Sequence, residues 1–421
     1  MLFTILGIAI CLAVLLQLGL FAIGTWSQMS FNRQQYAASK HLLQKQIQNS
    51  VAVAASQQVN RSPMQIPGDW KGFREFFVAQ VTPETSDCKS VYLKPVDGKP
   101  ITSFQPGQHL TIRLPIPGET KPLVRCYTIS DGPGKDYYRI TVKAIAGPPG
   151  TELPPGKVSC FLNANLIVGD RLDIKSPSGN FFLDRSNAPV VMLAGGIGVT
   201  PFISMIDSLV EQQSSRTVLL AYGVRNSQEQ PFKQYINDVC QSHANIHVVN
   251  CFSSPTADDV RGTDYHVDGY VSVDMLKKIL PNNEYLFYLC GPPPFMNSLF
   301  DGLKEWGVPE SRIRFEAFGP ATIKRKRAAE TTDSSAIASD VNFSASGKKI
   351  NWDSDCDSLL DLAEANQINI EFGCRAGSCG SCETDLLSGK VRYIEGATPT
   401  CSPDKCLVCI AQPQGSVELG A

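Results

Sequence analysis

The sequence has little histidine, no excess of charge of either sign and no repeated segment. Its five histidines are scattered along 421 residues, so neither a histidine metal cluster nor a histidine-based catalytic triad is indicated. Lys and Arg number 38 against 40 Asp and Glu, and the net charge of −2 gives no support for nucleic-acid binding. Fourteen cysteines are too few for a disulfide-rich secreted protein of this length. The length allows two or three domains.

The cysteines gather in one segment near the C-terminus. Cys374, Cys379 and Cys382 follow the spacing Cys-x4-Cys-x2-Cys, and more cysteines lie downstream. With a distant fourth cysteine, this spacing is typical of a loop around a plant-type [2Fe–2S] cluster. Zinc sites usually combine two tight Cys or His pairs, and one tight pair is present here. The segment therefore predicts an iron–sulfur cluster, in preference to zinc or a disulfide.

The fourth ligand has three candidates, Cys401, Cys406 and Cys409. Cys409 lies in Leu-Val-Cys-Ile-Ala, an apolar run that predicts a buried strand facing the cluster loop, with Cys406 at the mouth of that strand. Since side chains alternate along a strand, Cys406 and Cys409 are not expected to share a face. Cys409 is the predicted ligand.

The surrounding region, Val341 to Val417, resembles the plant-type ferredoxin domain. It begins with an alternating segment at Val341-Asn-Phe343 and a hairpin near Gly347, and a helix is expected over Ser358–Asn366. The cluster loop and the turn Gly389-Lys-Val391 follow in the family's order. The resemblance implies a β-grasp fold.

No Lys or Arg precedes the apolar run at the N-terminus. Leu2 to Trp26 carries no charge and, as a helix, would be about 37 Å long, enough to cross the hydrocarbon core. A cleaved signal peptide, the rival interpretation, would have a basic start and a shorter apolar core. We therefore expect an uncleaved single-pass anchor in membrane lipid. The basic residues that follow it place the later domains in the cytoplasm; they are Arg33, Lys40 and Lys45.

From about Phe73 to Leu183, short alternating segments punctuated by Pro and Gly predict an antiparallel β-barrel. The expected strands are Phe76–Val81, Val91–Lys94, His109–Leu114, Cys126–Ser130 and Tyr138–Lys143. The segment Arg125-Cys-Tyr127-Thr128 offers a phosphate partner, an aromatic ring for an isoalloxazine face and a hydroxyl for its reactive nitrogen. Gly156-Lys-Val158-Ser159 opens a short helix whose free N–H groups suit a pyrophosphate. A surface ion pair for Arg125 and simple packing for Tyr127 are the structural alternatives.

From Pro189 the pattern changes to strand–helix alternation, which predicts a parallel α/β sheet. The strand Val190–Ala194 runs into Gly-Gly-Ile-Gly-Val-Thr-Pro and the helix Phe202–Val210. Glycines there let a dinucleotide approach, and the helix N-terminus faces its diphosphate. Three further strands are expected to complete the sheet: Thr217–Tyr222, His247–Asn250 and Tyr285–Leu289. The last ends at Cys290-Gly291-Pro292, where α/β sheets bind ligands, although a buried strand cysteine is the alternative.

The four motifs of residues 73–320, in this order, resemble the ferredoxin–NADP reductase superfamily. The resemblance implies that Cys290, Tyr127 and Thr128 act at the hydride-transfer site and that Glu316 orients the nicotinamide or tunes the flavin. The residues it implies in cofactor binding are Arg125, Tyr127, Thr128, Lys143, Gly156, Val158, Ser159, Gly195, Gly196, Gly198, Thr200, Pro201, Arg225, Cys290, Gly291, Pro292 and Phe318.

The order of domains is similar to that of class IA oxygenase reductases of the phthalate and vanillate type and of the hybrid-cluster-protein reductase, except for the anchor. It implies electron flow from NADH or NADPH through flavin and cluster to an acceptor protein, expected to be membrane-bound. The pyrophosphate donors favour FAD over FMN, whereas Arg225 and Glu229 leave the choice between NADH and NADPH open. The sodium-pumping NADH–quinone reductase also has an anchored flavin subunit, but its ferredoxin domain precedes the flavin domain. A non-catalytic redox sensor is the other alternative.

The expected architecture is therefore a multidomain chain with a transmembrane helix, an antiparallel β-barrel flavin domain, a parallel α/β nicotinamide domain and a β-grasp ferredoxin domain. The expected boundaries are 1–26 for the anchor, 27–70 for a juxtamembrane tether, 71–185 for the flavin domain, 186–320 for the nicotinamide domain, 321–339 for a linker and 340–421 for the ferredoxin domain.

Overall fold

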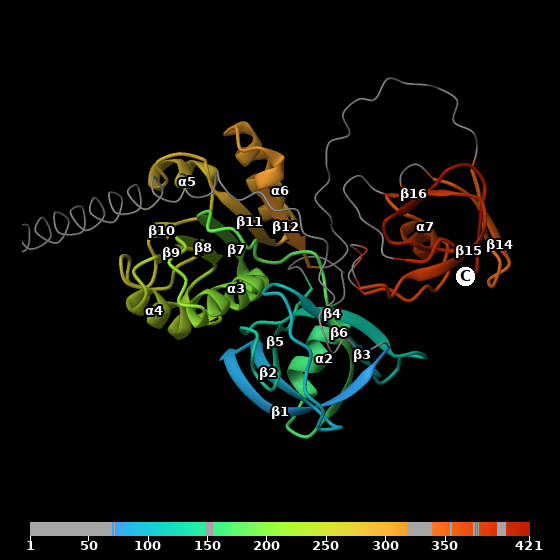
Figure 1. Cartoon of the computed structure of the whole chain (residues 1–421), viewed down its shortest axis with the longest axis horizontal. Helices are drawn as coiled ribbons and strands as arrows, with labels where there is room; N and C mark the ends of the chain where they lie inside the picture. Colours follow the sequence, from blue (N-terminus) through green and yellow to red (C-terminus); the bar gives the residue numbers. More distant parts are fainter. Residues whose placement is uncertain are drawn as a thin grey trace, which may run out of the picture.

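The computed structural model describes three folded units (Figure 1). The described residues are 70, 72–147, 155–318, 339–353, 356–373, 375, 377, 379–393 and 401–421. The predicted anchor, nearly all of the tether and linker, and Cys374 lie outside them. No helix in these ranges combines the length and apolarity needed to cross a bilayer.

The first unit is the predicted antiparallel barrel, built from a six-stranded sheet in the order β4-β3-β6-β1-β2-β5. Its elements are β1 (Arg74–Thr85), β2 (Cys88–Pro95), β3 (His109–Leu114), β4 (Leu123–Thr128), β5 (Tyr138–Lys143), α2 (Lys157–Asn165) and β6 (Arg171–Ser178). A bridge between Ile129 and Ile140 joins the end of β4 to β5 and closes the sheet. Inward side chains such as Leu110 and Ile112 form the core, against which α2 buries Val158 and Leu162.

Two details of the barrel correct the sequence-based expectation. The strand expected at Cys126–Ser130 begins earlier, at Leu123, and ends at Thr128, because it pairs with β3 along its whole length. The sixth strand, β6, was not among the predicted strands; its Lys175-Ser-Pro-Ser178 end is polar and breaks the apolar alternation.

The second unit is a parallel sheet in the order β10-β9-β8-β7-β11-β12. Its elements are β7 (Val190–Gly195), η1 (Gly196–Val199), α3 (Thr200–Glu211), β8 (Val218–Val224), η2 (Ser227–Glu229), α4 (Lys233–Ser242), β9 (Ile246–Phe252), β10 (Val267–Asp268), α5 (Val273–Ile279), β11 (Leu286–Gly291), α6 (Pro293–Glu305), η3 (Glu310–Arg312) and β12 (Ile313–Ala317). One core packs α3 and α4 against the sheet and another packs α5 and α6 (Figure 1).

The expectation of four strands in this sheet was wrong, since β10 and β12 extend it at both edges to six. The short edge strand β10 has two residues, too few for a periodic pattern. Strand β12 pairs with β11 in parallel register and thereby places Glu316 beside Cys290. This register brings a carboxylate to the predicted ligand-binding edge.

The third unit is a mixed five-stranded sheet, β14-β13-β19-β15-β17, with a two-stranded sheet, β16-β18. Its elements are β13 (Asp340–Phe343), β14 (Lys348–Asn351), α7 (Leu359–Ala365), β15 (Glu383–Ser388), β16 (Val391–Tyr393), β17 (Lys405–Leu407), β18 (Ala411–Pro413) and β19 (Val417–Leu419). Helix α7 is capped by the Ser358 hydroxyl, which accepts from the Asp361 N–H, and it buries Leu359 and Leu362.

The strand expected around Cys409 is the main correction in this unit. Cys406 lies on strand β17, not at its mouth, and residues 408–410 form the turn that follows. Side chains in a turn do not follow the alternation of a strand. The argument from alternation therefore did not decide whether Cys406 or Cys409 faces the cluster loop.

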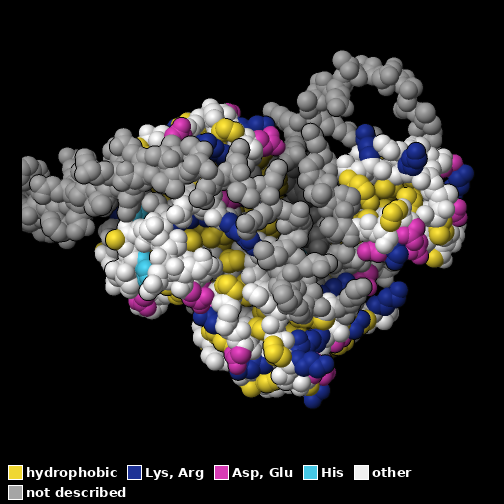
Figure 2. All heavy atoms as spheres, viewed as in Figure 1, with side chains coloured by type: hydrophobic (Ala, Val, Ile, Leu, Met, Phe, Trp, Pro, Cys, Tyr) yellow, Lys and Arg dark blue, Asp and Glu magenta, His cyan; other side chains and the backbone are white. Residues whose placement is uncertain are grey.

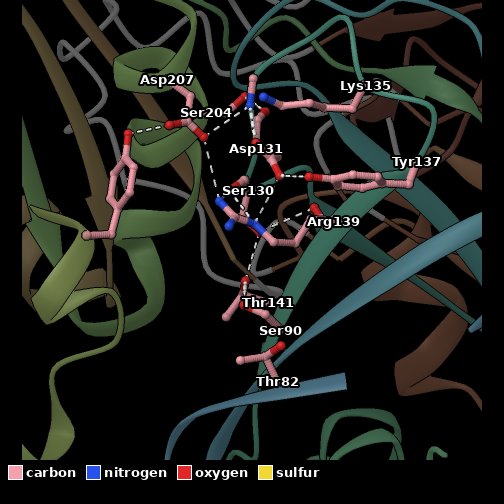
Figure 3. A network of polar contacts seen from close by, with 12 residues as sticks. Thr82, Ser90, Ser130, Asp131, Lys135, Tyr137, Arg139, Thr141, Ser204 and Asp207 are labelled. Atoms are coloured by element: carbon pink, nitrogen blue, oxygen red, sulfur yellow. Dashed lines mark hydrogen bonds and ion pairs between the residues drawn. The ribbon is translucent and has the colours of Figure 1, made fainter. Parts of the chain in front are cut away.

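A polar network fastens the first unit to the second (Figure 3). The Ser204 hydroxyl of α3 donates to the carbonyl of Asp131, 2.8 Å away. The Gly132 N–H donates to Asp131 Oδ1 at 2.9 Å and to Asp207 Oδ2 at 3.2 Å, so two carboxylates share one donor. Arg139 lies between them, 3.6 Å from Asp131 and 3.7 Å from Asp207. The buried seam holds the two units in a fixed relation.

Candidate active site

The predicted hydroxyl of Thr128 lies at the seam between the two units. Thr128 on β4 is the cross-strand partner of His109 on β3, so the two side chains project to the same side of the sheet. Thr128 Oγ1 is buried and has no hydrogen-bond partner among the described residues. A buried, unpartnered hydroxyl normally has a ligand or water to bind.

Glu316 reaches the same place from β12 of the second unit. Its Oε1 lies 3.6 Å from His109 Nδ1, and the His109 and Glu316 side chains are 4% and 17% exposed. The other oxygen, Oε2, is buried and has no partner in the described parts of the chain. Two buried polar atoms, Thr128 Oγ1 and Glu316 Oε2, thus lie at the interface of the first two units without a hydrogen-bond partner among the described residues. Such atoms are expected where a flavin and a nicotinamide would meet.

Cys290 is fully buried in β11, next to Ala194 of β7 and Glu316 of β12 in the register of the sheet. Burial raises the pKa of its thiol well above the usual value, and the Glu316 carboxylate raises it further. A neutral thiol shapes and orders a site but is no nucleophile. Cys290 therefore lies at the end of the strand that the sequence predicted. Its full burial also agrees with the alternative interpretation, a packed cysteine in the core.

The predicted dinucleotide edge depends on close backbone approach. A Cβ at Gly198 would overlap the carbonyl oxygen of Cys290, so the turn η1 can lie on β11 only because this residue is glycine. Helix α3 follows directly with Thr200, whose N–H donates to the Ile197 carbonyl, and with Pro201, which has no N–H. The N–H groups without a side-chain cap at this edge are therefore those that begin η1. Gly195, Gly196, Gly291 and Pro292 line the same strand ends. The edge offers donors to a diphosphate.

The predicted pyrophosphate loop has the corresponding form. Helix α2 begins after Gly156 without a side-chain cap, so its first N–H groups have no side-chain acceptor. Ser159 donates from Oγ to the Gly156 carbonyl at 3.2 Å. Val158 is buried in the barrel core, which makes its side chain a packing group and leaves only its backbone for a cofactor.

Arg125 and Tyr127 lie on β4, as predicted. Arg125 donates from Nη1 to the Val124 carbonyl at 2.7 Å, and its guanidinium carbon is 5.1 Å from the ring centroid of Phe372 in the third unit. Burial lowers the pKa of Arg125 and raises that of Tyr127. Arg125 therefore contacts the third unit in addition to any phosphate it binds.

Three other predicted contacts lie further out. Lys143 Nζ is 3.2 Å from Asp87 and 3.6 Å from Glu229, so it bridges the first two units. Arg225 is 70% exposed and lies 3.4 Å from the same Glu229. Phe318 follows β12 and is exposed.

Two predicted cluster ligands are brought together by the third unit. Cys382 Sγ and Cys409 Sγ are 3.1 Å apart, and both side chains are buried. A Cβ at Gly373 would lie 2.9 Å from Cys379 Sγ, which places that thiol against the loop backbone. Cys374 is outside the described residues, and the described residues alone do not bring three ligands together. The thiolate donors and the glycine-tight loop fit a [2Fe–2S] cluster.

Sequence reasoning missed His109, Cys126, Phe372 and the Asp131–Asp207 seam. His109 begins a strand after Pro-Gly-Gln, and no motif marks it. All of these residues matter because they touch a different unit, which is a tertiary relation without a local signal. Both signs of charge occur on each unit on the face shown in Figure 2, with Lys and Arg most frequent over the barrel.

Comparison with known families agrees with this division. Residues 82–183 match the oxidoreductase FAD-binding domain, residues 192–300 the oxidoreductase NAD-binding domain and residues 341–414 the 2Fe-2S iron–sulfur cluster binding domain.

Individual relatives cover parts of the chain. It is 40% identical over 255 residues to the flavohemoprotein of Bacillus anthracis, a match covering 60% of this chain and 63% of that protein. The chain thus spans less than two thirds of this relative. The FAD/NAD-binding domain of nitric oxide dioxygenase from Vibrio cholerae shares 31% identity and a TM-score of 0.53 over 59% of this chain and 100% of that one.

Phthalate dioxygenase reductase has the same fold along most of the chain. Its TM-score is 0.50 at 23% identity, over 83% of this chain and 98% of that one. The uncapped start of α2 fits the pyrophosphate of FAD, and the glycine-lined edge before α3 fits the diphosphate of NAD(P)H. The two unpartnered oxygens lie where flavin and nicotinamide would meet, and the clustered cysteines fit a [2Fe–2S] cluster. From these domains and their order we conclude that the chain is an NAD(P)H-dependent iron–sulfur flavoprotein oxidoreductase, built from an oxidoreductase FAD-binding domain, an oxidoreductase NAD-binding domain and a C-terminal 2Fe-2S ferredoxin domain.

Proposed function

We propose that this reductase draws electrons from NADH and passes them through its [2Fe–2S] domain to a membrane-bound acceptor protein, while an anchor at residues 1–26 holds its catalytic domains on the cytoplasmic face. When bound, the flavin accepts hydride and releases electrons singly, which is why one chain carries both sites. The protein's own residues bind, orient and separate these groups.

The observation that carries the proposal is the position of strand β4. At one end, Thr128 lies at the seam with the nicotinamide domain, where Glu316 and Cys290 converge. Three residues earlier on the same strand, Arg125 contacts Phe372 in the ferredoxin domain. A single strand therefore lies between the electron entry and the electron exit, as a relay requires.

Each side chain has a task that follows from its surroundings. Thr128 Oγ1 and Glu316 Oε2 supply polar groups that no other described residue satisfies. Buried, neutral Cys290 excludes water from the seam. The uncapped start of α2 binds phosphate, and the glycine edge before α3 admits the second diphosphate.

NADH is proposed over NADPH because of Glu229. Its carboxylate already pairs with the exposed Arg225 and with Lys143, so a 2′-phosphate would have to displace an anion. The acidic group suits a ribose hydroxyl better.

The anchor and the acceptor are tested together. The full chain, extracted in detergent, should copurify with a membrane protein that becomes reduced when NADH is added; oxygenases, desaturases and cytochromes are the classes to probe. Recovery of soluble partners alone would contradict a membrane-bound acceptor. A variant lacking residues 1–30 should leave the membrane fraction and still reduce ferricyanide with NADH; if it stayed with the membrane, the anchor would be wrong.

A further inference from the structure

The ring of Phe372 contacts two guanidinium groups that come from different domains. Arg375, in the cluster loop itself, places its guanidinium carbon 4.0 Å from the ring centroid. Arg125, on strand β4 of the flavin domain, places its own at 5.1 Å. Both distances are within the range of a cation–π contact.

The ferredoxin side of this contact is held rigidly. Arg375 pairs with Asp361 at 3.5 Å and with Glu364, both on α7, and its side chain is 14% exposed. Its backbone has a φ of +54°, the left-handed region, which turns the loop back over α7. Phe372 is therefore presented on a fixed loop, with one ring face already covered.

The flavin-domain side is equally constrained. Arg125 is tied to the Val124 carbonyl and is partly desolvated, and the neighbouring positive charge of Arg375 also lowers its pKa. Two like charges repel each other, and here the carboxylates that pair with Arg375 and the electron-rich ring of Phe372 offset that repulsion. Glu364 adds a compensating negative charge.

Next to the ring, the loop backbone rests directly on β4. A Cβ at Gly373 would lie 3.3 Å from Cys126 Sγ on β4 and 2.9 Å from Cys379 Sγ, a predicted cluster ligand. A side chain at position 373 would therefore crowd both thiols. Cys126 itself is held by Thr111, whose Oγ1 is 3.5 Å from Sγ. The cluster loop and the flavin strand thus meet through Gly373 and the side chain of Cys126.

We propose that Phe372 is the positioning residue that docks the ferredoxin domain on strand β4, and that its contact with Arg125 sets the separation of flavin and cluster. The inference rests on the electron path proposed above. In the step it governs, one electron leaves the reduced flavin and one is gained by the oxidised cluster; after two such steps, the single proton that arrived with the hydride has passed to solvent.

The test uses the full-length holoenzyme with Phe372→Leu, which keeps the apolar volume but removes the aromatic face. Phe372→Tyr is the rescue variant, and Leu387→Ala, at a 56% exposed position of β15, is the matched control. The first readout is the rate at which iodoacetamide alkylates Cys126, followed by mass spectrometry. The second is stopped-flow, which separates flavin reduction by NADH from cluster reduction.

Phe372→Leu should raise Cys126 alkylation roughly three- to thirtyfold, the range of a partly desolvated cation–π contact, and should slow cluster reduction while leaving flavin reduction unchanged. Phe372→Tyr and Leu387→Ala should behave as the unmodified enzyme. The electron paramagnetic resonance spectrum of the cluster, reduced chemically, should stay normal in all three.

Unchanged alkylation in Phe372→Leu, with an intact cluster spectrum, would overturn the docking role. Faster alkylation with unchanged cluster reduction would overturn the positioning role. If NADH failed to reduce the cluster even in the unmodified enzyme, the proposed electron path would fail, and alkylation would still decide the docking.

Discussion

Glu316 and His109 face each other across the seam of the flavin and nicotinamide domains, with Oε1 3.6 Å from Nδ1. One residue comes from the edge strand of the parallel sheet and the other from the barrel. Any rotation of one domain on the other would separate them, so the pair reports whether the seam is closed.

The pair should matter for hydride transfer. Glu316→Gln should slow flavin reduction by NADH roughly 10- to 100-fold, because a misplaced group at the reacting centre costs about that much. His109→Gln should have a smaller effect in the same direction, since it acts through Glu316. Stopped-flow at saturating NADH measures both, with His247→Gln on β9 as the control. Equal rates in all variants would show that the pair is only structural.

Cys290→Ala should slow flavin reduction without changing the cluster spectrum. The thiol is buried beside Glu316, and its loss leaves a small void at the hydride-transfer site. Cofactor binding should change less, because the phosphate-binding helix starts are elsewhere. Stopped-flow and flavin titration together check this; a normal reduction rate would assign Cys290 to packing.

Cys379→Ser should abolish the [2Fe–2S] signal in electron paramagnetic resonance and leave flavin absorption in place, since separate domains hold the two groups. The spectra of the purified variant, reduced with dithionite, provide the measurement. Retention of a normal cluster signal would remove Cys379 from the ligand set.

The fourth ligand is decided by a pair of variants. Cys409→Ser should lose the cluster, because Cys409 Sγ lies 3.1 Å from Cys382 Sγ. Cys406→Ser should keep it, because Cys406 lies within strand β17, before the turn that brings Cys409 to Cys382. Iron content and the cluster spectrum distinguish them. The reverse pattern would exchange the assignments.

Asp207 should make the seam weaken as pH rises. Burial raises its pKa to about 7, so between about pH 4 and 7 the folded state keeps a proton that the unfolded chain has released. The free energy of unfolding therefore falls through this window, on the order of 2–4 kcal/mol. Asp207→Asn should flatten that slope in thermal melts from pH 5 to 8. The exposed Asp238→Asn on α4 should leave it unchanged; an unchanged slope in Asp207→Asn would show that other groups titrate.

The sequence motifs predicted features that lie within one helix, strand or turn. The contacts between distant elements became visible only in the structure. Arg125 and Thr128 on a strand, the helix after Gly156 and the glycine turn at Gly198 follow from local patterns, because each needs only neighbouring residues. Phe372 beside Arg125 and His109 beside Glu316 join segments more than 200 residues apart, and no periodicity encodes them.

The cysteine that follows β17 shows why local reasoning fails at strand ends. Alternation argued correctly that two cysteines three residues apart do not share a strand face. It did not foresee that the chain leaves the strand at Leu407, so that a turn presents Cys409 to Cys382. Where a strand ends depends on its partner, β15, and not on its own sequence.

The cross-strand pairing of His109 and Thr128 limits how this barrel can change in length over evolution. One residue inserted into β3 or β4 would turn one of the two side chains to the opposite side of the sheet and empty the seam. Insertions in the exposed connection, residues 116–121, would leave the register intact. Related chains should therefore vary in size at that connection while keeping the two strands at constant length.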